Sequence, residues 1–126
     1  MATAADLRAL ALALPEAYED THRGKPAFRV NKRIFAMLGV ETPGGARDGF
    51  FAHLSGARPV VGLKLDRDDQ LNMIAAFPEA VGQTETYGHH GWTYVWLDVI
   101  DPDGLAMLVR LAWTCVAPKR LSKPRP

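Results

Sequence analysis

Basic side chains, gathered in two runs that lack acids, are the first feature of this sequence that could carry out recognition chemistry. Residues 21–40 and residues 119–126 contain lysines and arginines but no aspartate or glutamate. Such runs can neutralise the phosphates of a nucleic acid. The candidate phosphate contacts are Arg23, Lys25, Arg29, Lys32, Arg33, Lys119 and Arg120. A solvated surface explains the same charges equally well, because basic runs often serve only solubility.

An aromatic row is the second feature that could bind a partner. Trp92, Tyr94 and Trp96 are separated by single residues, so in a strand their rings share one face. An exposed aromatic face can stack bases, bind a small ligand or bind a hydrophobic protein surface, including that of a second copy. Alternatively the row is itself the core, because tryptophan is usually largely buried. The sequence leaves both interpretations open.

Motifs for catalysis or metal binding are absent from the sequence. His89 and His90 are adjacent, and adjacent residues of a strand point to opposite faces, so they are poorly placed to share an ion. Cys115 falls on the apolar face of a predicted helix, where a reactive thiolate is disfavoured. Neither serine has the flanking glycines of a nucleophile elbow. We therefore expect a protein without catalytic residues, metal or cofactor.

The composition is that of one globular domain. The chain has 126 residues, of which 48% are hydrophobic and 23% charged. Its net charge is +1, but residues 21–40 and 119–126 are basic, so the rest of the chain is acidic. No apolar run reaches the length of about 20 residues that a membrane span needs, and the Ala-Leu-rich start lacks the basic region of a signal peptide. We expect a cytoplasmic protein with no membrane partner. Residues 1–117 are predicted to form the domain and residues 118–126 a mobile, basic, proline-rich tail.

Hydrophobic spacing predicts the elements that would position these side chains. Helices are expected from Thr3 to Pro15, from Asp66 to Pro78 and from Asp101 to Pro118. Strands are expected at 17–23, 26–31, 33–38, 60–65 and 92–99, with a weak strand or loop at 81–88 and a further short strand at 50–54. The order is α-β-β-β-β-α-β-β-α. This pattern predicts an α+β fold in which an antiparallel sheet of about five strands carries helices on one face.

A hairpin with a basic turn is the clearest local prediction. Asn31 tolerates the positive φ of a two-residue turn, whereas Lys32 is less favourable there than glycine. In the second strand Ile34, Ala36 and Leu38 are expected on one face and Phe35 on the other.

Several short motifs, spread in order along nearly the whole chain, resemble those of one protein family. They are Leu14–Ala17, Glu19, His22, Gly24, Pro26–Val30, Lys32, Phe35–Ala36, Gly62–Leu65, Gly91–Trp92, Val95, Leu97, Val116–Ala117 and Lys119–Leu121. In order and approximate spacing they resemble the MmcQ/YjbR proteins. One position departs from the pattern, because Ala112–Trp113 stands where the family's last helix commonly carries Ser-Tyr.

The resemblance implies a small α+β domain similar to the secretion-chaperone fold and a DNA-binding function. Combined with the basic hairpin, it predicts non-catalytic binding of duplex DNA through phosphate contacts. The alternative is a protein-interaction or small-ligand module that uses the aromatic row, with a homodimer as one form.

Overall fold

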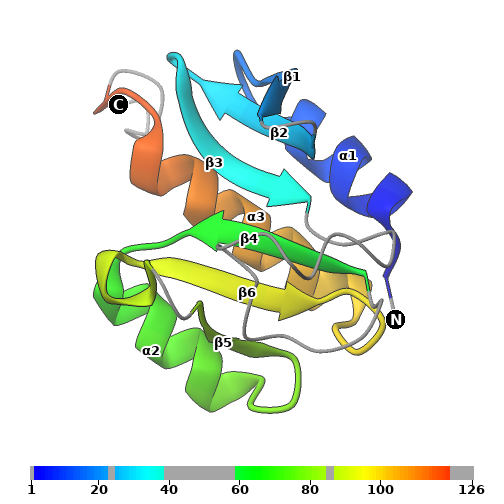
Figure 1. Ribbon diagram of the computed structural model, residues 1–126, viewed down its shortest axis with the longest axis vertical. Coiled ribbons are helices and arrows are strands. Elements are labelled where there is room, and N and C mark those ends of the chain that lie inside the picture. The colour runs from blue at the N-terminus through cyan, green and yellow to red at the C-terminus, as the bar shows by residue number, and fades with distance from the viewer. Residues whose placement is uncertain (1, 23–24, 39–58, 85–86, 120–126) are drawn as a thin grey trace, which may run out of the picture.

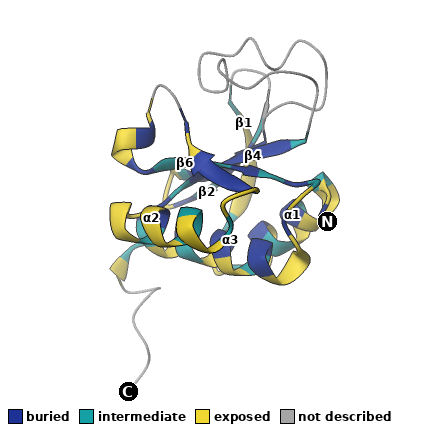
Figure 2. Cartoon of the chain, turned by 90° about the horizontal axis from the view of Figure 1, so that it is seen from below, coloured by how far each residue is buried: buried dark blue, intermediate teal, exposed yellow. Residues whose placement is uncertain are grey.

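The computed structural model describes residues 2–22, 25–38, 59–84 and 87–119. These residues form a six-stranded antiparallel sheet, in the order β1-β2-β3-β4-β6-β5, and three α-helices (Figure 1). Figure 2 shows all three helices on the same side of the sheet. The predicted α+β fold, with an antiparallel sheet and helices on one face, is confirmed.

The elements follow one another in the predicted order. The helices are α1 (Ala4–Leu12), α2 (Arg67–Ala76) and α3 (Pro102–Val116), and a 3-10 turn, η2, spans Gly88–His90. The strands are β1 (Tyr18–His22), β2 (Lys25–Val30), β3 (Arg33–Leu38), β4 (Val60–Lys64), β5 (Val81–Gln83) and β6 (Trp92–Trp96). The sixth strand is β5, which pairs with β6 at the edge of the sheet. The strand predicted at 50–54 and most of the predicted tail lie outside the described residues.

The helix starts are fixed by the side chains that the sequence suggests. The Thr3 hydroxyl accepts a hydrogen bond from the Asp6 amide at 3.1 Å, and the Asp6 carboxylate accepts from the Thr3 amide at 3.0 Å. Asp101 caps α3 by accepting from the Gly104 amide at 3.0 Å, with Pro102 in the first turn. Among the described residues, no helix is both long and apolar enough to cross a membrane.

The core lies between the sheet and the helices, and a bulge in the β2–β3 pair changes which residues reach it. Phe28 pairs with Ala36 but Arg29 pairs with Ile34, so Phe35 is an extra residue in β3. Phe35 and Ala36 therefore both pack in the core under the helices, whereas Ile34 packs on the opposite face. The strict alternation predicted for this strand is wrong, because it assumed an uninterrupted ladder.

Candidate nucleic-acid interface and aromatic sheet face

The β2–β3 turn presents two cations at the tip of the hairpin. The paired residues Val30 and Arg33 enclose a two-residue turn in which Asn31 has φ 51° and Lys32 has φ 67°. Positive φ at both positions is the type I′ turn that matches the twist of a hairpin. Lys32 and Arg33 are exposed, and among the described residues neither forms an ion pair with a carboxylate. Two positive charges are therefore available to an external anion.

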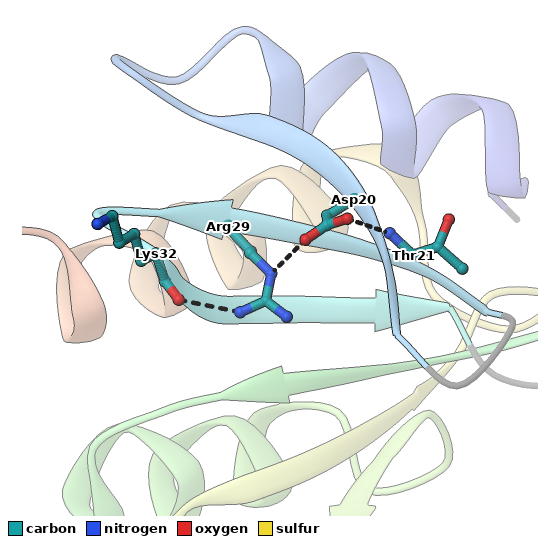
Figure 3. Close-up of polar contacts among 4 residues, drawn as sticks. All are labelled: Asp20, Thr21, Arg29 and Lys32. Carbon is teal, nitrogen blue, oxygen red and sulfur yellow. Dashed lines mark hydrogen bonds and ion pairs between the residues drawn. The ribbon is translucent and has the colours of Figure 1, made fainter.

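Arg29 has a different environment from its basic neighbours (Figure 3). Its Nε donates to Asp20 Oδ2 at 3.0 Å, and its NH1 group donates to the Lys32 carbonyl at 2.9 Å. The other Asp20 oxygen accepts from the Thr21 amide at 2.7 Å. Arg29 thus joins β1 to the backbone of the turn, and the Asp20 carboxylate offsets its charge.

Strand register brings further cations to the same end of the sheet as the turn. β4 runs antiparallel to β3, so its last residue, Lys64, lies near the first residue of β3, Arg33. The Lys64 ammonium donates to the His90 carbonyl, and Arg67 donates to the Gly88 carbonyl at 3.0 Å. Lys64 and Arg67 were not predicted as site residues, because their proximity to the hairpin depends on how β3, β4 and β6 pair.

The last turn of α3 lies close to this end as well. Burial, together with the Asp66 charge, raises the pKa of the Cys115 thiol, while the charges of Lys64 and Arg33 act in the opposite direction. Those two cations are therefore near enough to the end of α3 to affect its thiol. Lys119, which follows α3, is exposed.

Acids at the start of α2 limit the positive charge of this end. Asp66, Asp68 and Asp69 occupy the cap and the first turn of the helix. Burial raises the pKa of Asp69, and the neighbouring carboxylates of Asp66 and Asp68 raise it further. This end therefore mixes both signs of charge, and its exposed cations are Lys32 and Arg33 at the hairpin tip, Arg67 and Lys119.

The remaining predicted phosphate contacts lie in parts of the chain for which no side-chain position is described. Arg23 and Arg120 are outside the described residues, and only the backbone of Lys25 is described, in β2. The structure therefore gathers Arg29, Lys32 and Arg33 on one hairpin, with Lys119 beyond the end of α3.

The aromatic row lies on the sheet face opposite the helices. Thr93 and Val95 are fully buried on the helix side, whereas Trp92, Tyr94 and Trp96 are half-buried. The three rings pack with the side chains of a second, smaller cluster, which contains Ile34, Met37 and Val60. The interpretation that this row forms the core beneath the helices is therefore wrong.

Close packing orders the rings of this face. The Tyr94 and Trp96 rings meet edge to face, with centroids 5.7 Å apart. The Tyr94 ring also covers Gly82 on the neighbouring strand, so that a Cβ at position 82 would overlap it. A side chain at position 82 would therefore have to displace the end of the Tyr94 ring.

A buried glutamine, which the sequence did not single out, holds η2 against the sheet. The Gln70 side chain is fully buried on α2. Its amide nitrogen lies 3.1 Å from the Gly88 carbonyl, 3.2 Å from the Trp92 carbonyl and 3.0 Å from the Thr93 hydroxyl. In the sequence, the only indication that Gln70 would be buried and hydrogen-bonded was its position next to the hydrophobic stripe of α2.

The histidines of η2 lie next to each other at the surface. The His89 and His90 rings are 4.0 Å apart between centroids. Within the described part of the chain, no group of three or more histidine, cysteine or acidic side chains is placed to hold a metal ion.

Comparisons with known proteins place the chain in a family. A family model described as YjbR matches residues 12–115. A crystal structure of the Deinococcus radiodurans protein DR2400, with a domain described as DUF419, superposes with a TM-score of 0.71. That superposition covers 98% of this chain and 84% of that chain, at 21% sequence identity, and so shows a shared fold. No curated protein matches the chain. Since the family model covers most of the sequence, the chain belongs to the YjbR family.

Proposed function

We propose that this protein binds duplex DNA without catalysis, through phosphate contacts made by the tip of the β2–β3 hairpin. The observation that carries the proposal is the turn itself. Lys32 holds a positive φ in a position that favours glycine, and it stands beside Arg33. Keeping a lysine in this conformation costs about 1–2 kcal/mol relative to glycine. Such strain is typical of positions where the side chain has a function, here the contact of its charge with a phosphate.

The charge environment of the hairpin supports the same proposal. Asp20 is engaged by Arg29, so it does not offset the charges of Lys32 and Arg33 directly. Because Arg29 also donates to the Lys32 carbonyl, it acts as a positioning residue for the turn. Lys119 adds a further cation beyond the end of α3. A DNA duplex bound through phosphate contacts alone would be bound regardless of its base sequence.

The salt dependence of binding gives the proposal a magnitude. If Lys32, Arg33 and Lys119 each contact one phosphate, the slope of log affinity against log salt is about −2.7. Affinity for a duplex then falls about fortyfold between about 50 and about 200 mM salt. Removing both hairpin cations would reduce the slope to about −0.9.

Fluorescence anisotropy with a labelled duplex, repeated over a range of salt concentrations, tests these values. The variants are Arg33→Ala and the double substitution Lys32→Ala with Arg33→Ala. The matched control is Arg110→Ala, which removes an exposed arginine from α3 and changes the net charge by the same amount as Arg33→Ala. We expect a smaller slope for the hairpin variants and a wild-type slope for the control. Equal slopes for Arg33→Ala and Arg110→Ala would refute the proposed role of the hairpin.

A second candidate function is favoured by the placement of the aromatic row on the face opposite the helices. Half-buried Trp92, Tyr94 and Trp96 retain ring surface that a second copy of the chain could cover. In that case the protein is an interaction module and forms a homodimer. Its expected cytoplasmic location is compatible with both functions.

Tryptophan quenching and the mass in solution separate the two candidates. Trp113 is buried among the helices, so replacing it with phenylalanine leaves emission from Trp92 and Trp96. Dimerisation through the aromatic face predicts a light-scattering mass of two chains, and weaker acrylamide quenching as the concentration rises. A monomer with concentration-independent quenching would exclude the dimer.

A further inference from the structure

A pocket of about 310 Å³ lies between the end of α2 and the segment that joins β6 to α3. Residues 76–80 form one wall and residues 99–101 the other. The pocket is adjacent to the end of β6 that lies away from Trp92, whereas the residues near the hairpin are at the Trp92 end. It is therefore separate from the proposed DNA-binding end, and its volume is at the small end of the range for ligand sites.

The floor of the pocket is apolar and well packed. Ile100 is 1% exposed, and a Cβ at Gly104 would lie 3.0 Å from its Cδ1 atom and 3.2 Å from the ring of Phe77. Val99, by contrast, is 40% exposed and offers apolar surface at the rim. An aliphatic group could exchange water contacts for contacts with Phe77 and Val99, above the buried Ile100.

Backbone hydrogen bonds hold the two walls together. Trp96 links the walls, because its amide donates to the Ala80 carbonyl at 2.8 Å and its carbonyl accepts from the Ile100 amide at 3.0 Å. The Ala80 amide also donates to the Phe77 carbonyl at 3.0 Å. Each wall is thus tied to the sheet or to the end of α2. Little ordering of the backbone is then needed when a ligand enters, and this lowers the entropic cost of binding.

Glu79 and the C-terminal end of α2 give the rim of the pocket its negative charge. Glu79 lines it with an exposed carboxylate, whereas the Asp101 carboxylate caps α3 and offsets the partial positive charge of that helix end. The C-terminal end of α2, with its partial negative charge, points toward it and carries no basic residue in its last turn. The sequence between Arg67 and Arg110 contains no lysine or arginine, so no cation of this segment offsets the acids.

We propose that this pocket binds a small aliphatic ammonium ion. The hydrocarbon part packs on Phe77 and Val99, and the ammonium group lies toward the Glu79 carboxylate. The proposal combines an apolar floor with a negative rim, and each part makes its own prediction. It does not depend on DNA binding.

Titration of the isotopically labelled full-length protein with n-butylammonium, followed by amide chemical shifts, tests the site. We expect saturable shifts for residues 76–81 and 98–101, with a millimolar dissociation constant. Each methylene that is added from ethylammonium to butylammonium should tighten binding about threefold to fourfold. Butyrate, which has a similar length and the opposite charge, should not produce saturable shifts.

Two isosteric variants test the role of charge. Glu79→Gln should weaken butylammonium binding about threefold, because it removes a partly exposed charge. The control, Asp68→Asn, removes the same charge at the far end of α2, about 12 Å away along the helix. It should bind as the wild type does. Circular dichroism verifies that both variants are folded.

Four outcomes would overturn the proposal. Equal binding of butanol or butyrate would remove the assignment to a cation. Equal weakening by both variants would make the effect one of net charge. The absence of saturable shifts would remove the site itself. Self-association that Glu79→Gln abolishes would assign the pocket to a second copy of the chain.

Discussion

Replacing Lys32 with glycine should stabilise the fold and weaken DNA binding at the same time. Lys32 has φ 67°, a conformation that costs an ordinary residue about 1–2 kcal/mol and glycine almost nothing. Glycine also increases the conformational entropy of the unfolded chain, and this cancels about 0.5–1 kcal/mol of the stabilisation. The Arg29 hydrogen bond to position 32 is retained, because its acceptor is a backbone carbonyl.

The net expectation is a stabilisation of about 0.5–1 kcal/mol. For a domain of this length, that gain raises the melting temperature by about 2–4 °C. The loss of one phosphate contact should reduce the salt slope by about 0.9, which amounts to about eightfold weaker DNA binding near 0.1 M salt.

Thermal unfolding and duplex anisotropy, measured on the same preparations, check both parts. Lys32→Ala is the matched control, because it removes the same charge but keeps a Cβ at positive φ. It should lose the same DNA affinity without the gain in stability. A lower melting temperature for Lys32→Gly would refute the argument from turn strain. Wild-type DNA affinity in both variants would refute the role of the Lys32 charge.

Three other predictions concern packing and titration. Gly82→Ala should displace the Tyr94 ring and destabilise the fold by about 1–3 kcal/mol, as measured by urea unfolding. A double-mutant cycle with Tyr94→Ala should show coupling between the two positions, and additive effects would contradict the contact. Gln70→Met should cost about 2–3 kcal/mol, since it removes the two hydrogen bonds that the Gln70 NH2 group can donate and the one that its oxygen accepts from Arg67, at about 1 kcal/mol each. An unchanged urea midpoint would contradict that role. The raised pKa of Cys115 means that the folded state holds the thiol proton more tightly, so the free energy of unfolding should fall as pH rises above 9.0, the thiol's ordinary pKa. Asp66→Asn should lower that pKa and speed alkylation at alkaline pH; an unchanged alkylation rate would contradict the effect of the Asp66 charge.

Local patterns in the sequence were sufficient to predict most of the elements. The Thr3 and Asp101 caps mark the starts of α1 and α3, and the dense β-branched and aromatic run marks β6, because each of these signals acts within a few residues. The Asn31-Lys32 turn was predicted for the same reason. The bulge at Phe35 was not, since it depends on how β2 and β3 pair.

The environment of the candidate site depends on contacts between distant segments. Arg29 is next to Asp20 only because β1 pairs with β2 in one particular register. Lys64 approaches the hairpin because β4 pairs with β3, although a long segment of the sequence separates these two strands. A basic run therefore indicated where charge is concentrated, but it could not show which cations are already engaged.

The most direct test of DNA binding by the hairpin is to map a bound duplex on the labelled protein by amide chemical shifts. The proposed function predicts the largest changes at Asn31, Lys32, Arg33 and Lys119, and their loss as salt is raised. Changes confined to Trp92–Trp96 or to residues 76–80, or no saturable changes at low salt, would contradict it.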